Sequence, residues 1–478
     1  MAPLVQELAE RGHQVTGIFF NTLKIEHENY KEIVVPYDLD FIMKEASKIL
    51  MEKGGTSIFN PKMWVWSWNM WGEMMRNSSS VMFAEDGVTE LLKSKPQVDV
   101  VVTFMHSGAF FAEYFDCPII QFSPAGPFPS LLHGTGNIIN RSVQPQLNLP
   151  FIEPMTFLQR LTNHIMISFM DWILLKVAND IHEVQKTIVE DIATPIEIAK
   201  RRQVMCIASS HYVTHGSWPY LPNVIEVGGL ALKDPKPLPS DLEKFMDSSP
   251  SGVVFVSFGS SLKPDQMPQE KLDIFVNAFR SLDMQVIWKW DAEVPNLPQN
   301  VKISSWLPQQ DLLGHPNLKV FVTHGGLGSL VESIYHKAVI VGIPFSNDQK
   351  PNILRAVGHG YATSLDWDNF SAEELVQKIK QAMRNETMRA AMERIHNLYV
   401  DREEKPLDKA AWWVEYVCRH KGADMLRSAG TEDIPWYQYH HVDILIFLVI
   451  IIFSIVGGVY VSCKLCCNMC CSKKVKTE

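Results

Sequence analysis

A histidine followed by two glycines, His324-Gly325-Gly326, stands where an apolar run ends and a helical pattern begins. Because glycine has no side chain, a turn of this kind lets a ligand approach the backbone closely. The unpaired N–H groups at the start of the following helix then face that ligand, and the helix dipole favours a negative charge there. The spacing therefore predicts a turn that binds an anion such as phosphate.

The residues that position this turn have the pattern of a parallel β-sheet. Residues 319–323 (KVFVT) and 339–343 (VIVGI) are short apolar runs typical of buried strands, and Pro344 ends the second. Between them, apolar side chains recur at helical spacing, at Leu327, Leu330, Val331, Ile334 and Tyr335. The order strand, glycine turn, helix, strand is the unit from which parallel sheets are built.

A dinucleotide-binding fingerprint is the main alternative for these glycines. Gly326 and Gly328 have the right spacing, and Asp348 follows twenty residues after Gly328. However, Val331 occupies the third glycine position, and Asp348 lies beyond the next strand and its Pro344. The pattern therefore disfavours a nicotinamide cofactor.

Two polar side chains near the turn each have a structural and a functional interpretation. His324 is either a core histidine or a ligand-binding group, and its place at a strand end beside two glycines favours the second. Glu332 follows about two helical turns later. It is either part of a solvated helix face or an acceptor for the hydroxyls of a ribose, since a diol needs acceptors.

Length and composition predict a large α/β protein of two domains. The chain has 478 residues, which is enough for two domains of about 200 residues each. Its 46% hydrophobic and 20% charged residues exclude disorder. The net charge is −9 and no basic stripe is present, so nucleic acid is not an expected partner. Further buried-strand patterns are found at residues 98–103, 119–122, 204–208, 252–258, 285–289 and 301–304.

Two stretches are unusually rich in large apolar side chains. Residues 60–84 carry four Trp and five Met, and residues 155–177 are similarly apolar. Helices buried in the core are the favoured interpretation of both. A pocket for an apolar ligand and a surface resting on a membrane are the alternatives.

The C-terminal region predicts a single membrane anchor. Residues 444–463 contain no charge, and twenty apolar residues span about 30 Å of hydrocarbon. Aromatic residues precede the run and lysines follow it, which places the tail in the cytosol and the body in a lumen. A buried core helix is the disfavoured alternative.

Smaller signals agree with a lumenal body. Four glycosylation sequons begin at Asn77, Asn140, Asn369 and Asn385. Five of the eight cysteines crowd the cytosolic edge of the anchor, where palmitoylation is a better interpretation than disulfides or a metal site. Lys474 and Lys476 resemble a retrieval signal of the endoplasmic reticulum (ER), and they also fit a stop-transfer cluster.

In combination, these motifs resemble the UDP-glycosyltransferase family. WLPQ at 306–309, THGG at 323–326 with its later glutamate, and GIPFSNDQ at 342–349 carry the resemblance, which extends from Ala2 to the tail. The family implies a GT-B fold, that is, two Rossmann-like domains facing across a cleft. It also implies an ER-membrane enzyme that transfers glucose or glucuronate from a UDP-sugar to a hydroxyl of a small lipophilic acceptor, with inversion. The UDP-sugar is a co-substrate, so no cofactor or metal is expected, and association with copies or paralogues is open.

The resemblance also divides the chain. Residues 1–215 would form the acceptor-binding domain, without its first strand. The remaining segments would be a linker (216–250), the UDP-sugar-binding domain (251–420), a juxtamembrane segment (421–443), the transmembrane helix (444–463) and a cytosolic tail (464–478).

By resemblance, eleven residues would bind the donor: Ser257, Gly259, Ser260, Trp306, Gln309, His324, Gly325, Gly326, Glu332, Asp348 and Gln349. Trp306 would stack on uracil, because a flat ring suits a flat base. Gln309 would bind the base or ribose, and Glu332 the ribose. Asp348 and Gln349 would bind hydroxyls of the sugar. The remaining residues would surround the diphosphate.

The catalytic base is where the sequence departs from the family. Family members place a histidine after the first strand, before the helix that begins here near Ala2, and that position lies upstream of Met1. The acidic partner of the base corresponds to Phe104, which cannot orient an imidazole. His13 matches a structural histidine of the family. We therefore expect an N-terminally truncated enzyme or, alternatively, a catalytically silent UDP-binding protein or regulatory dimerisation partner.

Overall fold

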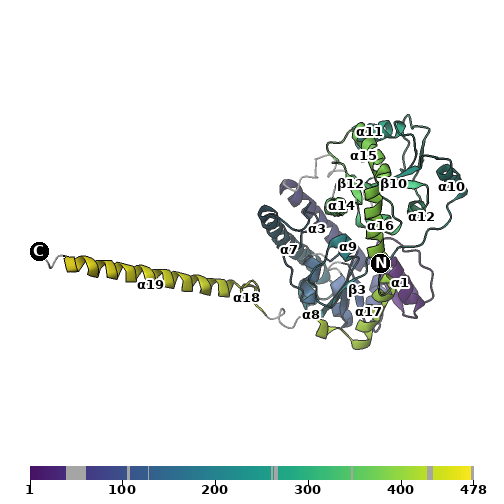
Figure 1. Cartoon of the computed structure of the whole chain (residues 1–478). Coiled ribbons are helices and arrows are strands. Elements are labelled where there is room, and N and C mark those ends of the chain that lie inside the picture. Colours follow the sequence, from purple (N-terminus) through teal and green to yellow (C-terminus); the bar gives the residue numbers. More distant parts are fainter. Residues whose placement is uncertain are drawn as a thin grey trace. The chain divides into compact units, whose positions relative to one another are not determined.

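The computed structural model describes residues 1–38, 61–104, 108–127, 129–259, 262, 267–345, 348–427 and 434–474. The chain divides into two compact units, Met1–Arg427 and Ser428–Glu478. Figure 1 shows the first unit as a mixture of helices and strands and the second as one long helix.

The first half of the larger unit contains two parallel sheets. Strand β1 (Val15–Phe19) pairs with β2 (Tyr30–Val34). A four-stranded sheet has the order β3-β4-β5-β6. Its strands are β3 (Val101–Thr103), β4 (Ile119–Ser123), β5 (Gln203–Ala208) and β6 (Val224–Glu226). The helices of this half are α1 (Ala2–Glu10), α3 (Pro61–Ala84), α4 (Asp86–Ser94), α5 (Ala109–Phe115), α6 (Pro129–Leu132), α7 (Phe157–Gln185), α8 (Pro195–Arg202) and α9 (Tyr212–His215).

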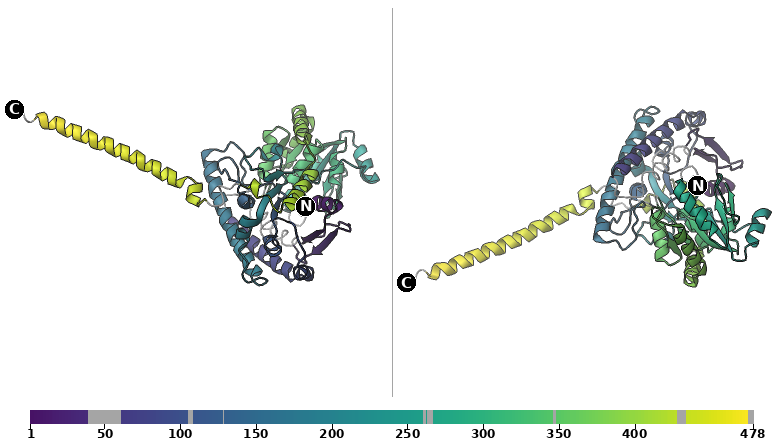
Figure 2. Two further views of the ribbon diagram at one scale, coloured as in Figure 1. Left: turned by 90° about the horizontal axis from the view of Figure 1, so that it is seen from below. Right: turned by 90° about the horizontal axis from the view of Figure 1, so that it is seen from above.

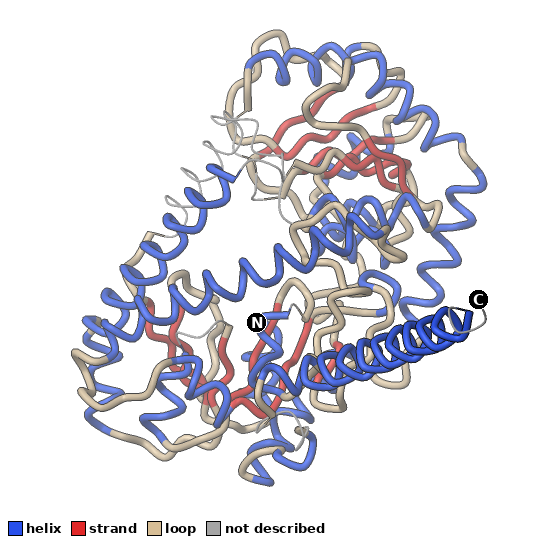
Figure 3. Tube along the Cα trace, turned by 90° about the vertical axis from the view of Figure 1, so that its left-hand side faces the viewer, coloured by secondary structure: helices blue, strands red, loops and turns tan. Residues whose placement is uncertain are grey.

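The second half is built on a six-stranded parallel sheet of order β12-β11-β10-β7-β8-β9. The strands are β7 (Val253–Ser257), β8 (Gln285–Lys289), β9 (Val301–Ser304), β10 (Leu318–Thr323), β11 (Ile340–Gly342) and β12 (Ala362–Ser364). The helices are α10 (Ser240–Asp247), α11 (Gln269–Arg280), α12 (Gln309–Leu313), α13 (Leu327–Tyr335), α14 (Gln349–Gly358), α15 (Ala372–Arg384), α16 (Glu386–Val400) and α17 (Pro406–His420). Figure 3 shows the strands of the two larger sheets as separate groups, each accompanied by helices.

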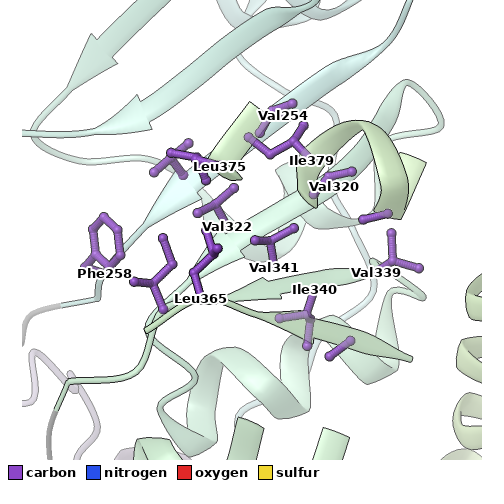
Figure 4. Packing of buried hydrophobic residues seen from close by; sticks show 14 of the residues in the cluster. Val254, Phe258, Val320, Val322, Val339, Ile340, Val341, Leu365, Leu375 and Ile379 are labelled. Atoms are coloured by element: carbon purple, nitrogen blue, oxygen red, sulfur yellow. The ribbon is translucent and has the colours of Figure 1, made fainter. Parts of the chain in front are cut away.

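Apolar packing on both faces explains why the central strands are continuous apolar runs. Val254, Val320 and Val322 point to one face, where Leu375 and Ile379 of α15 cover them (Figure 4). On the other face, Phe255 and Phe321 stack with ring centroids 5.0 Å apart. Strands buried on both faces are typical of parallel sheets, and the predicted α/β class is confirmed.

Sequence patterns located most strands of the two larger sheets, including the three-residue strands β3 and β11, and missed three others. The runs at 285–289 and 301–304 coincide with β8 and β9. Strands β2, β6 and β12 were not predicted, because three to five residues give too little alternation to recognise. Both β6 and α10 lie within residues 216–250, the predicted linker.

Helix α17 packs on the first half of the chain. Ala411, Val414 and Val417 share a buried cluster with Leu4 and Leu8 of α1. Nearby, His13 Nε2 lies 3.2 Å from Glu415 Oε1, which agrees with a structural role for this histidine.

The apolar stretch predicted at 155–177 lies in α7, which has one buried and one exposed face. Thr156 and Gln159 form a capping box at its start. Ile173, Val177 and Ile181 are packed inside. Leu161, Ile165 and Trp172 are exposed, so burial in the core accounts for only one face.

The second unit is dominated by α19 (Val442–Lys474), which follows the short α18 (Trp436–Tyr439). Within it, Val442–Asn468 is long and apolar enough to cross a membrane. The helix therefore extends beyond the predicted span of residues 444–463, and both views in Figure 2 show it as continuous.

Candidate functional site

The predicted glycine turn lies where three neighbouring strands end. Thr323 at the end of β10 is paired with Ser257 of β7 on one side and with Gly342 of β11 on the other. Since the strands are parallel, the segments that follow them emerge at the same edge of the sheet. The turn of residues 324–326 is therefore flanked by Gly259 and by the segment that leads to Asp348.

His324 is held between two glycines that leave room for its ring. It is 5% exposed. A Cβ on Gly326 would lie 2.6 Å from His324 Nε2, and a Cβ on Gly259 would lie 3.0 Å from Cε1. Burial lowers the pKa of His324 to about 4, and the nearby charge of Lys289 acts in the same direction. The imidazole is therefore neutral at pH 7 and carries one N–H donor.

The backbone of the turn requires glycine and opens towards solvent. Gly325 has a φ of +83°, and a Cβ there would lie 2.3 Å from Ile353 Cγ1. Gly326 is the N-cap of α13 and has no side chain with which to cap the helix. A Cβ placed on Gly328 would point into open space: apart from its chain neighbours and the nearby backbone of its own helix, no heavy atom of the described residues lies within 4 Å. A helix N-terminus can bind an anion, and here Leu327 N donates to the carboxylate of Asp348; the predicted contact with phosphate stays a prediction.

Two residues expected to bind the nucleoside are in contact. Gln309 Nε2 donates a hydrogen bond to Glu332 Oε2 and lies 3.3 Å from Ser329 Oγ. Burial raises the pKa of Glu332, while the hydrogen bond from Gln309 and the charge of Lys289 oppose this shift. A half-buried carboxylate beside an amide is suited to binding vicinal hydroxyls.

Trp306 presents its ring to solvent. It lies between β9 and α12, is 71% exposed, and its carbonyl oxygen accepts a hydrogen bond of 2.7 Å from Ser304 Oγ. By contrast, Trp288 on the neighbouring strand is fully buried. An exposed indole on an ordered backbone is available to stack on a planar ligand.

Asp348 and Gln349 lie at the start of α14, beside the glycine turn. Asp348 Oδ2 accepts hydrogen bonds from Leu327 N (3.3 Å) and Asn352 Nδ2 (2.8 Å). Burial raises the pKa of Asp348, and these hydrogen bonds oppose the shift. Gln349 is buried, and its Oε1 accepts from Phe345 N at 3.0 Å.

Of the two serines predicted to contact a diphosphate, the described one is Ser257, the last residue of β7. Ser257 is fully buried, and its Oγ accepts a hydrogen bond of 3.3 Å from Gly259 N. Ser260 lies outside the described residues. Their predicted contact with a diphosphate stays a prediction.

Sequence reasoning missed two residues at this edge. Lys289 ends β8, and its Nζ donates a hydrogen bond of 3.4 Å to Gly259 O. Asn352, one helical turn after Asp348, contacts both Asp348 and Gly325. For Lys289, the only sequence signal was a lysine at the end of an apolar strand. For Asn352, the only signal was its spacing of four residues from Asp348.

In the first half, Phe104 follows β3 and is 41% exposed. Residues 105–107 lie outside the described residues. A phenyl ring offers no hydrogen bond to a neighbouring imidazole, so Phe104 does not supply the acidic group expected by resemblance.

A pocket combines residues of both halves near α14. Its lining combines apolar residues with six polar ones: Ala125, Gly126, Pro127, Pro145, Leu147, Phe151, Trp218, Tyr220 and Pro351, together with Gln144, Gln146, Thr214, His215, Asn352 and Arg355. His215 Nδ1 lies 2.8 Å from Thr214 Oγ1, and burial lowers the pKa of His215 to about 4. Asn352 connects this pocket to Asp348.

Comparison with known proteins agrees with the motifs. Residues 1–477 match a family model described as "UDP-glucoronosyl and UDP-glucosyl transferase". The chain is 33% identical over 477 residues to UDP-glycosyltransferase UGT5 of Dactylopius coccus, with 97% of this chain and 88% of the relative covered. It is 29% identical over 494 residues to human UDP-glucuronosyltransferase 2B10, with 98% and 90% covered.

Solved glycosyltransferase structures share the fold. The spinosyn forosaminyltransferase SpnP superposes with a TM-score of 0.59 at 14% identity, over 87% of this chain and 95% of the other. The calicheamicin glycosyltransferase CalG4 superposes with a TM-score of 0.55 at 16% identity, over 88% and 94%. At these identities the likeness concerns the fold alone.

Proposed function

Because the chain belongs to the UDP-glycosyltransferase family, whose members are hexosyltransferases, we propose that it transfers glucose or glucuronate from UDP to a lipophilic acceptor hydroxyl. The transfer would proceed with inversion at the anomeric carbon. The observation that carries the proposal is the arrangement at one sheet edge. A neutral His324 and the N-terminus of α13, whose Leu327 N donates to Asp348 Oδ2, lie at the same edge of the sheet as the Gln309–Glu332 pair.

This arrangement suits each part of the donor. Uracil would stack on Trp306, and the ribose hydroxyls would donate to Glu332. The diphosphate would accept from the N–H of His324 and from the start of α13. Glycosyl transfer needs this stabilisation, since UDP leaves as an anion from a transition state with oxocarbenium character. Asp348 and Gln349 would face the sugar.

The acceptor would enter from the pocket that Asn352 and Arg355 share with the first half. The apolar part of its lining, which includes Pro127, Leu147 and Trp218, would suit an apolar molecule. Asn352 lines the pocket and donates to Asp348, the carboxylate that we propose binds the sugar. We propose no base for the acceptor proton among the described residues.

We further propose an ER-membrane location with the body in the lumen and the tail in the cytosol. The apolar helix Val442–Asn468 supports membrane insertion, and the lysines after it support the orientation. Exposed sequon asparagines at Asn77, Asn140 and Asn369 are accessible to glycosylation.

Phe104 favours a second candidate function. An exposed phenyl ring at the position of the acidic partner suits a UDP-binding protein that does not turn over, or one that regulates active relatives by association. Both candidate functions require the same UDP-binding site, and they differ in whether the sugar is transferred to an acceptor.

One experiment tests the site and separates the candidates. The full-length chain in lipid nanodiscs is titrated with UDP by calorimetry and is then given UDP-glucose or UDP-glucuronate with a panel of phenols. UDP binding with acceptor-dependent UDP release supports the transferase, whereas binding without release supports the silent protein. Absence of UDP binding overturns the donor site.

A further inference from the structure

The side-chain amide of Asn352 connects two parts of the candidate site. It is 5% exposed and lies in the second turn of α14. Its Nδ2 donates to Gly325 O at 3.0 Å and to Asp348 Oδ2 at 2.8 Å. The first acceptor belongs to the glycine turn and the second to the carboxylate expected to bind the sugar.

The side-chain amide of Asn352 supplies two donors from one NH₂ group, one for Gly325 O and one for Asp348 Oδ2. Both partners are acceptors, so the NH₂ group must face them, and its two hydrogens are used once each. Aspartate has the same shape without donors and would place a second negative charge against Asp348. Leucine has a similar shape without any polar group. Either change leaves two oxygen atoms without their donor in a largely buried place.

The contact also restricts the carboxylate of Asp348. Leu327 N and Asn352 Nδ2 both donate to Oδ2, which fixes the rotation of the group from two directions. A carboxylate has about four lone-pair sites, so two donors on one oxygen leave capacity for ligand hydroxyls. The orientation of Asp348 is therefore set by the turn and by α14 together.

We propose that Asn352 is a positioning residue that acts through Asp348 to recognise the sugar of the donor, and not its UDP moiety. The proposal rests on the proposed function, since it requires the UDP-sugar site. Because an oriented acceptor loses less freedom when it binds, Asn352 should raise affinity for a UDP-hexose above that for UDP alone.

The test compares two affinities across a double-mutant cycle. UDP and the better-bound of UDP-glucose and UDP-glucuronate are titrated into the full-length protein and into N352L, D348N and the double variant. We expect N352L to weaken UDP-hexose binding about tenfold, as for loss of a charge-assisted hydrogen bond, while UDP binding falls by a smaller factor through the lost hydrogen bond to Gly325 O. In the D348N background, the added effect of N352L should fall below about twofold.

A matched control separates positioning from general stability. Asn300 likewise donates through Nδ2 to backbone oxygens, those of Phe279, Leu282 and Met284, away from this edge of the sheet. N300L should lower the unfolding temperature without changing the ratio of UDP-hexose to UDP affinity. If N352L does not fold, N352S keeps one hydroxyl donor and should give an intermediate ratio.

The outcomes distinguish failure of the role proposed for Asn352 from failure of the proposed UDP-sugar site. Equal loss of UDP and UDP-hexose affinity in N352L would overturn the inference and leave the donor site intact, as would equal effects in both Asp348 backgrounds. Failure of the wild-type chain to bind UDP would instead overturn the proposed function on which the inference rests.

Discussion

Arg355 of α14 and Glu153 of the first half are joined by two parallel hydrogen bonds, Nη1 to Oε1 at 2.6 Å and Nη2 to Oε2 at 2.7 Å. The pair packs against Gly216, where φ is +82° and a Cβ would lie 2.4 Å from Glu153 Oε1. Arg355 belongs to the helix that begins directly after Asp348. The ion pair therefore joins α14, the helix that follows Asp348, to the first half of the chain.

Replacing Glu153 by glutamine should destabilise the body of the protein by about 1–2 kcal/mol, between the values for surface and buried pairs. Burial tends to raise the pKa of Glu153, but the hydrogen bonds and charge of Arg355 outweigh it and hold the pKa below 4.5. The stabilisation is thus complete above the unfolded pKa and is lost as the pH falls through the folded one. Urea unfolding at pH 7 and at pH 3 measures the difference.

Glu183 provides the control for this prediction. Its pair with Lys186 is exposed, so E183Q should leave the unfolding midpoint unchanged at both pH values. A midpoint for E153Q equal to that of the wild type at pH 7 would contradict a stabilising role for the ion pair.

The glycine turn could be predicted because its physics is local. His324, Gly325 and the following helix are consecutive in the chain, and their spacing alone indicates an anion site. In this part of the site, neighbours in sequence are also neighbours in space. Gln309 and Glu332 were each expected to bind the nucleoside by resemblance, but they are 23 residues apart and their direct contact was not predicted.

Lys289 and Asn352 could not be predicted, since their roles depend on how the sheet is ordered. Lys289 reaches Gly259 because β8 lies beside β7, although 30 residues separate the two in sequence. Asn352 reaches Gly325 because β11 places α14 next to the turn after β10. Pattern and propensity carry no information about strand order, and the same limit hid the packing of α17 on α1.

Trp306→Ala should weaken UDP binding by about 1–3 kcal/mol, the range for aromatic rings stacked on bases. The ring is 71% exposed, so its removal costs little stability and the loss should appear in affinity alone. Trp412 of α17, which is also exposed, serves as the control, and W412A should bind UDP as tightly as the wild type. Unchanged UDP affinity in W306A would remove Trp306 from the site.

Glu332→Gln should stabilise the free protein and weaken UDP binding. Burial raises the folded pKa of Glu332 above 4.5, against the hydrogen bond of Gln309 and the charge of Lys289. The ionised group therefore costs stability at pH 7, and that cost disappears as the pH falls through the folded and then the unfolded pKa. Glutamine keeps an acceptor for Gln309 but loses the charge that holds the ribose hydroxyls, so affinity should fall about tenfold.

Thermal unfolding at pH 7 and at pH 4, together with UDP titration, measures both effects of this substitution. Exposed Glu293 gives the control, for which neither quantity should change. A variant E332Q that binds UDP normally would place the ribose elsewhere.

Lys289→Met should weaken UDP binding about tenfold and leave uridine binding unchanged, because a cation close to the site acts on the diphosphate. Lys289 Nζ lies 3.4 Å from Gly259 O, and its charge contributes to the lowered pKa of His324 and opposes the rise that burial causes in the pKa of Glu332. Methionine keeps roughly the length of the side chain and removes the charge together with the hydrogen bond to Gly259 O. Lys302, on the adjacent strand β9 and paired with Asp241 at 2.7 Å, is the matched control.

Calorimetry with UDP and uridine at two salt concentrations should show a weaker salt dependence for K289M than for the wild type or K302M. Equal losses for UDP and uridine would instead assign Lys289 to the nucleoside and leave the diphosphate to His324 and the start of α13.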